Sequence, residues 1–229
     1  MSEGITALMK ENAALVTKNL RYFFRILVSP VEFISSIKHS SSEQLVSATF
    51  FAALMSILNL VIALPLFRLL GMNVETTSYF VVDTILTYGF FFIYGSAFHL
   101  SAKIFRGKGN YTSSLVSFLY LKAFSPIGMI VGIPLELIFI GGIVNGTDII
   151  SIMSSPLSFV ELISLFSLLL VLSWYLISMV KVFCIVHKLG KTRGSCVVLV
   201  GFSLWCLISV LYEFPILQLF YKAYRTSGA

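Results

Sequence analysis

Long apolar stretches alternate along the chain with short polar and basic connections. Five of these stretches are long enough to cross a bilayer, because about twenty apolar residues suffice for one helix. The pattern therefore predicts an all-α, polytopic membrane protein with five transmembrane helices preceded by amphipathic interfacial helices. The predicted spans are Leu45–Phe67, Tyr79–Phe105, Ser113–Ile140, Leu157–Val186 and Ser195–Phe220.

Residues 1–44, which precede the first span, carry a different pattern. Between Gly4 and Ile37, apolar side chains recur at helical spacing and basic side chains are interleaved with them. A helix of this kind lies in the headgroup region of a bilayer, where its cations attract anionic lipids; a soluble linker helix is the alternative. Ser29-Pro30 should interrupt it, so a second short amphipathic piece, Val31–Ile37, follows. The apolar members are Leu8, Leu15, Leu20, Phe23, Phe24, Leu27 and Val28, and the basic members are Lys10, Lys18, Arg21 and Arg25.

Lysine and arginine gather in three segments: the arm, the second-to-third connection and the fourth-to-fifth connection. Five spans place these segments on one side of the membrane, and an excess of Lys and Arg marks the cytoplasmic side. We therefore predict a cytoplasmic arm at 1–44, a five-helix transmembrane domain at 45–220 and a short non-cytoplasmic tail at 221–229. The basic residues are Lys10, Lys18, Arg21, Arg25 and Lys38, then Lys103, Arg106 and Lys108, then Lys188, Lys191 and Arg193, against Arg68, Lys222 and Arg225 on the opposite side.

The composition excludes a water-soluble fold. Of the 229 residues, 58% are hydrophobic and 11% are charged, whereas a soluble domain has about 45–50% and about 25%. The net charge of +6 does not indicate nucleic-acid binding, because the basic residues lie between apolar runs and not on one face with aromatic residues. The three cysteines have the spacing of neither a disulfide framework nor a zinc site.

Two connections are short basic turns. The first, Ile104–Thr112, is cationic and interrupted by glycine, and the second is His187–Gly194. The first turn is expected to be a tight hairpin on the water side of the membrane, and its glycines are expected to adopt the positive backbone angles that a turn needs. The turn residues of interest are Arg106, Gly107, Gly109, His187 and Gly190.

Among the ionisable side chains inside the predicted spans, four acids and Lys122 are candidate functional residues. The four acids map toward the outer ends, whereas Lys122 lies deeper, about 15 Å from the cytoplasmic end at the usual helical rise. One hypothesis is an outward-facing acidic vestibule with Lys122 as counter-ion, which would handle a cation or a proton. The other, which we favour because charges at span ends cost little, is that the acids reach the interface while Lys122 snorkels or pairs with one of them. The acids are Asp83, Glu136, Glu161 and Glu213.

The third span combines prolines with spaced glycines. Pro126 and Pro134 each leave a backbone carbonyl without its helical partner, so we expect a kink or local unwinding. Gly128 and Gly132 form a G-x-x-x-G sequence, which would let another helix approach closely, although chance spacing explains it equally well.

His99 and His187 are expected near the cytoplasmic surface on separate spans. Two histidines could ligate a metal, but no carboxylate or thiol stands at the spacing of a known ligand set. We therefore expect interfacial histidines, no metal and no cofactor. The sequence also lacks an H-E-x-x-H, a G-x-S-x-G with triad partners, a Walker loop and a Rossmann fingerprint, so we do not predict an enzyme.

Four segments are informative when they are taken in order: Leu27–Ile34, Phe105–Tyr111, Tyr120–Pro126 and Val186–Lys191. In these segments the chain resembles the Yip family of five-span membrane proteins (Ypt/Rab-interacting, the Yip-one domain), and the resemblance covers nearly the whole chain in layout. In the eukaryotic branch it implies endoplasmic reticulum and Golgi membranes and partners among Rab-type GTPases. The arm of this chain is short and has no acidic Asp-Leu-x-Gly-Pro-type motif, so the chain is more similar to bacterial members and a bacterial inner membrane is expected.

These observations predict a non-enzymatic membrane scaffold, adaptor or bilayer-organising factor of Yip type, related to trafficking if the protein is eukaryotic. Its expected partners are the bilayer, anionic headgroups at the arm, and a second copy of the chain or other membrane proteins. A Rab-type GTPase is expected only in a eukaryote, and nucleic acid is not expected. The alternative is a transporter of a small solute, an ion or a proton, built on the broken third span around Lys122.

Overall fold

The computed structural model describes residues 16–37, 41–69, 74–144 and 158–213, together with residues 215, 216 and 219. Within these residues the chain forms helices and turns and contains no strand, which confirms the all-α prediction. Five helical stretches are long and apolar enough to cross a membrane. The protein is therefore an integral, multi-pass membrane protein.

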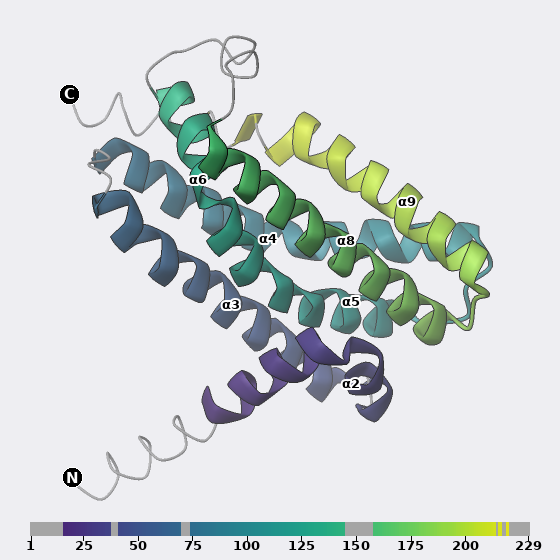
Figure 1. Ribbon diagram of the computed structural model, residues 1–229. Coiled ribbons are helices and arrows are strands. Elements are labelled where there is room, and N and C mark those ends of the chain that lie inside the picture. Colours follow the sequence, from purple (N-terminus) through teal and green to yellow (C-terminus); the bar gives the residue numbers. More distant parts are fainter. Residues whose placement is uncertain are drawn as a thin grey trace, which may run out of the picture.

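Each predicted span has a counterpart in the structure (Figure 1). The first, second and fourth spans are single helices, whereas the third is made of three consecutive pieces and the fifth ends in a π-helical turn. A short helix, α2, precedes the first span. The elements are α2 (Pro30–Ser36), α3 (Ser42–Leu69), α4 (Val74–Ile104), α5 (Tyr111–Tyr120), the 3₁₀ turn η1 (Leu121–Ala123), α6 (Phe124–Val144), α8 (Phe159–His187), α9 (Lys191–Ile208) and the π segment η2 (Ser209–Glu213).

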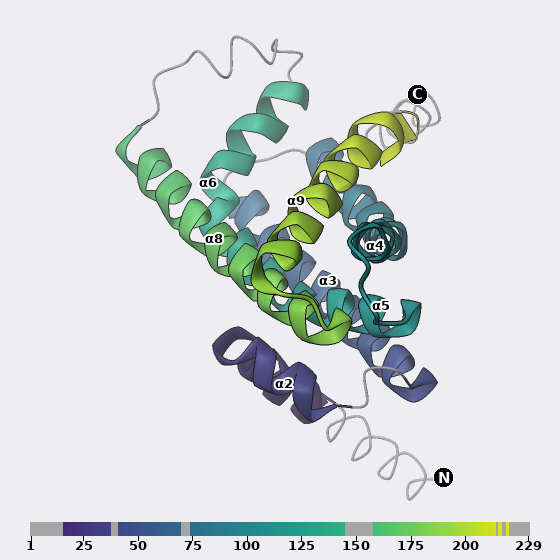
Figure 2. The same ribbon diagram turned by 90° about the vertical axis from the view of Figure 1, so that its right-hand side faces the viewer.

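The helices pack in pairs that are not always neighbours along the chain. α9 packs against α4 and α8, while α6 packs against α8 and α3. Figures 1 and 2 show α6 lying beside α8, and α4 on the other side of the bundle beside α9. α4 ends at the first basic turn and α9 begins at the second, so the end of the fifth span, at Glu213, lies beside Thr87 and Tyr94 in the middle of α4.

The third span departs from α-helical geometry where a proline predicts it. α5 ends at Tyr120 and the chain makes the 3₁₀ turn η1 before α6 begins at Phe124. Pro126 cannot donate a hydrogen bond to the carbonyl of Lys122, so the α-helical pattern fails at that turn. The unwinding expected near Pro126 is confirmed, whereas α6 continues through Pro134 without interruption.

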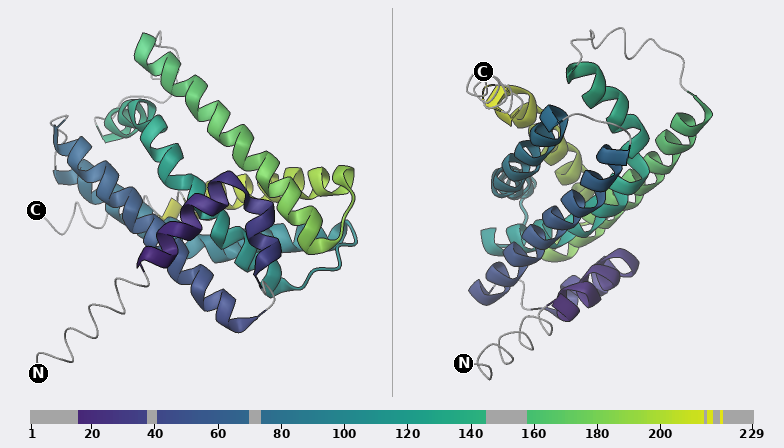
Figure 3. Two further views of the ribbon diagram at one scale, coloured as in Figure 1. Left: turned by 60° about the horizontal axis from the view of Figure 1, so that its bottom comes forward. Right: turned by 90° about the vertical axis from the view of Figure 1, so that its left-hand side faces the viewer.

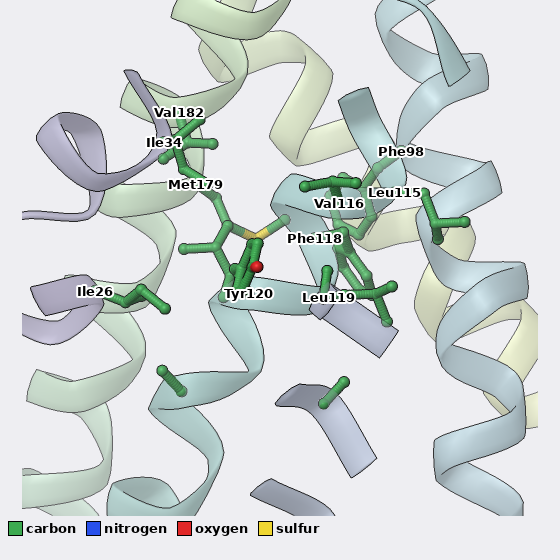
Figure 4. Packing of buried hydrophobic residues seen from close by; sticks show 14 of the residues in the cluster. Ile26, Ile34, Phe98, Leu115, Val116, Phe118, Leu119, Tyr120, Met179 and Val182 are labelled. Atoms are coloured by element: carbon green, nitrogen blue, oxygen red, sulfur yellow. The ribbon is translucent and has the colours of Figure 1, made fainter. Parts of the chain in front are cut away.

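Aromatic packing joins the arm to the bundle. The side chain of Tyr120 is fully buried, and its ring lies 5.0 Å from that of Phe33 in α2 and 5.3 Å from that of Phe51 in α3, between centroids. Its hydroxyl lies 3.1 Å from the hydroxyl of Ser47. Figure 4 shows Tyr120 close to Met179, with Ile34 and Val182 beyond it. The arm therefore shares the main hydrophobic core.

Residues 16–28 form a helix that ends at Ser29, and α2 begins at Pro30, which confirms the predicted break. α2 packs against α8, and Figure 3 shows both arm helices lying across the bundle, not along its axis. Ile26 and Phe33 are buried at the contact. The arm is thus docked on protein through one face, a contact that its amphipathic pattern alone does not reveal.

Candidate functional site

The two basic turns pack directly against each other. The backbone N–H of Lys108 in the first turn donates to the carbonyl of His187 in the second at 2.9 Å. The turns are also shorter than predicted, since α5 already begins at Tyr111 and α9 at Lys191. The two basic connections therefore lie at one end of the bundle, as their charge predicts.

The glycines of the first turn serve a different purpose from the predicted one. The residues with left-handed backbone angles are basic: Arg106 has φ of 63° and Lys188 has φ of 54°. A Cβ on Gly107 would lie 2.8 Å from the carbonyl oxygen of Ala102. A Cβ on Gly109 would lie 2.7 Å from the carbonyl oxygen of Val186 and 2.8 Å from Nδ1 of His187. The expectation of positive angles at these glycines is wrong, because what requires them is the close approach of the second turn.

Gly190 has no such constraint. It is the N-cap residue of α9 with an ordinary φ of −68°, and a Cβ built on it would meet nothing within 4 Å. Of the glycines predicted to matter in the turns, only the two in the first turn are sterically required.

Under the hairpin lies a hydrogen-bonded group that we call the histidine cluster: His99, Ser114 and His187. Nδ1 of His99 and Nε2 of His187 each lie 2.8 Å from the hydroxyl of Ser114. That hydroxyl donates to the carbonyl of Asn110 at 3.1 Å. A hydroxyl has one hydrogen and two lone pairs, so both ring nitrogens donate to it. The side chain of His187 is fully buried, and the cluster joins α4, α5 and α8.

A second polar group, the glutamate cluster, consists of Asp83, Thr87 and Tyr94 of α4, Lys122 of η1, and Ser209 and Glu213 of η2. Its centre is Glu213, which is only 7% exposed. Thr87 donates to Oε1 of Glu213 at 2.8 Å and Ser209 to Oε2 at 2.9 Å. Tyr94 also donates to Oε2 and lies 2.8 Å from the Ser209 hydroxyl. Glu213 is the last residue of the fifth candidate span, and three hydroxyls hold its carboxylate inside the protein.

Lys122 is a buried cation that contacts an aromatic ring. It is 8% exposed, and its ammonium lies 3.9 Å from the centroid of the Phe91 ring, a cation–π contact. The carboxylates that interact with it electrostatically are Asp83 and Glu213. The three ionisable residues come from three different elements, which the tertiary structure brings together.

Within the described residues, Glu161, Gly128 and Gly132 belong to neither cluster. Glu161 accepts a hydrogen bond from the backbone of Ser158 and forms a capping box at the start of α8, so its role is that of a helix-terminal acid. The side chain of Glu136 lies outside the described residues. Gly128 has open space where a Cβ would lie, so it mediates no close helix contact within the chain, while Gly132 is buried.

Sequence reasoning missed four hydroxyl residues of the two clusters, Thr87, Tyr94, Ser114 and Ser209, and three packing glycines. Asp83, Thr87 and Tyr94 are spaced by four and seven residues, which places them on one face of a helix, and this spacing was a usable signal. The glycines were not distinguishable by motif. A Cβ on Gly95 would lie 2.6 Å from Cδ1 of Leu115, one on Gly194 would meet Cys184, and one on Gly201 would meet Phe98.

Comparison with known proteins adds no relationship: no family model, no curated protein and no solved structure matches the chain.

Proposed function

We propose that the protein is a non-enzymatic, multi-pass membrane protein of Yip type that organises one face of a bilayer through its docked arm. The observation that carries the proposal is an apolar stripe on the outer side of the arm. Val16, Leu20, Phe24 and Val28 repeat every four residues and are 44–79% exposed. Residues at this spacing share one face of a helix, so the stripe faces away from the bundle and toward lipid.

The charge beside the stripe supports the same proposal. Lys18, Arg21 and Arg25 are exposed on the arm helix. Each basic residue near an anionic membrane surface contributes about 1 kcal/mol of attraction, so the three together contribute about 3 kcal/mol. The apolar stripe of the arm would insert at the boundary between headgroups and acyl chains, and the basic side chains would lie among the headgroups. The proposed orientation is an arm on the cytoplasmic side of a bacterial inner membrane and a carboxyl terminus outside.

The experiment places a fluorophore on the arm of the full chain in lipid nanodiscs. A probe on Phe24→Cys should be quenched by lipids that carry quenchers in their acyl chains, and more strongly in anionic than in neutral bilayers. A probe on Glu32→Cys, exposed in α2, is the matched control and should be quenched less. Replacing Lys18, Arg21 and Arg25 by glutamine should abolish the difference between lipids. Equal quenching at both positions would contradict the proposal.

Cross-linking in native membranes tests the scaffold part of the proposal. Capture of a second copy of the chain would support a self-assembling scaffold, and capture of a GTPase would support the adaptor role that the Yip resemblance implies. Reporter tags on the two termini test the orientation, because five spans require the tags to report opposite sides.

A second candidate function is transport of an ion, a proton or a small solute. The glutamate cluster favours it, since ionisable groups inside a membrane mark ion pathways more often than chance. Its test is flux into proteoliposomes that carry the wild-type chain or Lys122→Met.

A further inference from the structure

The two basic turns bring a group of cations together at one end of the bundle. The backbone N–H of Lys108 in the first turn donates to the carbonyl of His187 in the second, and Figure 1 shows both turns at the same end. Neither turn contains an aspartate or a glutamate, so no acid within them offsets the repulsion between their cations. The exposed basic residues that we call the cationic patch are Arg106, Lys108, Lys188, Lys191 and Arg193.

Two members of the cationic patch stand where glycine would be more favourable. Arg106 has φ of 63° and Lys188 has φ of 54°. This left-handed conformation is unfavourable for a residue with a Cβ, whereas glycine adopts it freely. Lys188 is also the C-cap residue of α8, and glycine is the usual residue where a helix ends in this conformation. The chain therefore keeps two basic side chains at a conformational cost, which indicates that these side chains have a use.

The start of α9 adds a second unfavourable placement of positive charge. The N-cap residue Gly190 makes no side-chain hydrogen bond to the first turn of the helix. Lys191 and Arg193 lie in that turn, although a helix N-terminus carries partial positive charge and favours anions over cations. A bound anion would relieve the repulsion between these side chains and the helix terminus.

A lipid headgroup is the anion that the position of the cationic patch favours. The first turn joins α4 to α5 and the second joins α8 to α9, and the ends of membrane spans lie at the level of the headgroups. Basic pockets between transmembrane helices bind headgroups that carry several phosphates. The hydrogen bond between the turns holds two sets of cations together, so after one phosphate has bound, a second phosphate on the same headgroup meets the other turn at high effective concentration.

We propose that the cationic patch is a binding site for a phospholipid whose headgroup carries two phosphates. One phosphate contacts the cations of the first turn, and the other contacts those of the second. The site deepens the proposed role in organising a bilayer, on which it rests for its use, but it contains no residue of the arm.

The experiment measures lipid binding to the full chain in a neutral detergent by native mass spectrometry. The probe is diphosphatidylglycerol, and the comparison is phosphatidylglycerol at twice the molar concentration, so that the amount of phosphate is equal. The chain should bind the diphosphate lipid about tenfold more tightly, because the two phosphates are linked. Equal affinity at equal phosphate would overturn the proposal, and would leave the cationic patch as a topology signal or as a surface for an acidic protein segment.

Two triple variants that remove the same number of charges separate the cationic patch from the arm. The variant in the turns should lose the preference for the diphosphate lipid, whereas the variant in the arm should keep it, even if the arm no longer attracts anionic bilayers. Failure of the site and failure of the proposed function of the arm are therefore distinguishable. An unchanged preference in the turn variant would overturn the proposal. The substitutions are Arg106→Gln, Lys188→Gln and Lys191→Gln in the turns, and Lys18→Gln, Arg21→Gln and Arg25→Gln in the arm.

Lys188→Gly excludes a loss of folding as the cause of weaker binding. Glycine relieves the left-handed conformation, so the unfolding temperature of the lipid-free protein should rise. The affinity for the diphosphate lipid should fall about fivefold, as expected for the loss of one basic residue near a phosphate. Unchanged affinity would overturn the assignment of Lys188 to the site, and with it the explanation of its backbone conformation.

Discussion

The histidine cluster and the glutamate cluster both place polar side chains between helices, but they satisfy the hydrogen bonds of these side chains in different ways. In the histidine cluster two ring nitrogens and a backbone carbonyl share one hydroxyl at Ser114. Beside this cluster, Gly107 and Gly109 have no side chain, so the backbones of the two basic turns can pack directly against each other. In the glutamate cluster the central group is a carboxylate with three hydroxyl donors, and its neighbours are charged.

The difference separates a shape-dependent site from a charge-dependent one. The histidine cluster holds two water-side turns together through close packing, so it should respond to changes of a single methyl group. The glutamate cluster depends on the charges that it holds, so it should respond to substitutions that replace a charged side chain by a neutral one of similar volume. The predictions below test this separation, and they run from the largest expected effect to the smallest.

Lys122→Met should cause the largest loss of stability. It keeps most of the volume of the side chain but removes the ammonium that lies 3.9 Å from the centroid of the Phe91 ring and interacts electrostatically with Asp83 and Glu213. A desolvated cation–π contact alone contributes about 2 kcal/mol or more. Thermal unfolding in detergent or nanodiscs at neutral pH measures the loss. Lys103→Met, at the end of α4, is the control, and an equal loss there would contradict the prediction.

Gly109→Ala should destabilise the hairpin by about 2 kcal/mol, because the added methyl group would collide with the backbone of Val186, and overpacking costs about 1–3 kcal/mol. Gly190→Ser is the matched control in the second turn, where space is open and serine is a favourable N-cap residue. The measurement is again the unfolding temperature, now at several pH values. A strong pH dependence of the Gly109→Ala effect would contradict the assignment of this end as shape-dependent.

Ser114→Ala should cost about 1–2 kcal/mol, since it removes the hydroxyl that lies 2.8 Å from a ring nitrogen of half-buried His99 and of buried His187, and losing a partner of a buried polar group costs about 1–3 kcal/mol. Ser195→Ala is the control, because Ser195 is exposed and bonds only to the carbonyl of Lys191 within its own helix. Equal stability of the two variants would show that the hydroxyl bridge contributes nothing.

Gly128→Ala should have the smallest effect, a change within about 1 kcal/mol in the stabilising direction, because alanine favours a helix over glycine and the position is open. The same variant tests whether this face joins two copies of the chain. If the yield of cross-linked dimer drops in Gly128→Ala while stability is unchanged, Gly128 lies at a contact between two copies of the chain. If the yield is unchanged, Gly128 faces lipid.

Much of the fold was predictable because its signals are local. The five spans, the break at Ser29-Pro30 and the unwinding before Pro126 depend on residues within a few positions of each other, so hydropathy and proline chemistry reveal them. The spacing of Asp83, Thr87 and Tyr94 also predicts that they share one face of a helix. The burial of Glu213 was not predictable, because its partner Tyr94 lies 119 positions away.

What the sequence by itself determined is the number of spans and the grouping of their basic connections, since lipid requires about twenty apolar residues for each crossing and cations gather on one side. Tertiary structure decided which glycines are required, where Glu213 and Lys122 lie, and how the arm docks on α8. These outcomes depend on contacts between helices that are distant along the chain, and every span has a similar apolar composition, so hydropathy cannot distinguish one neighbour from another.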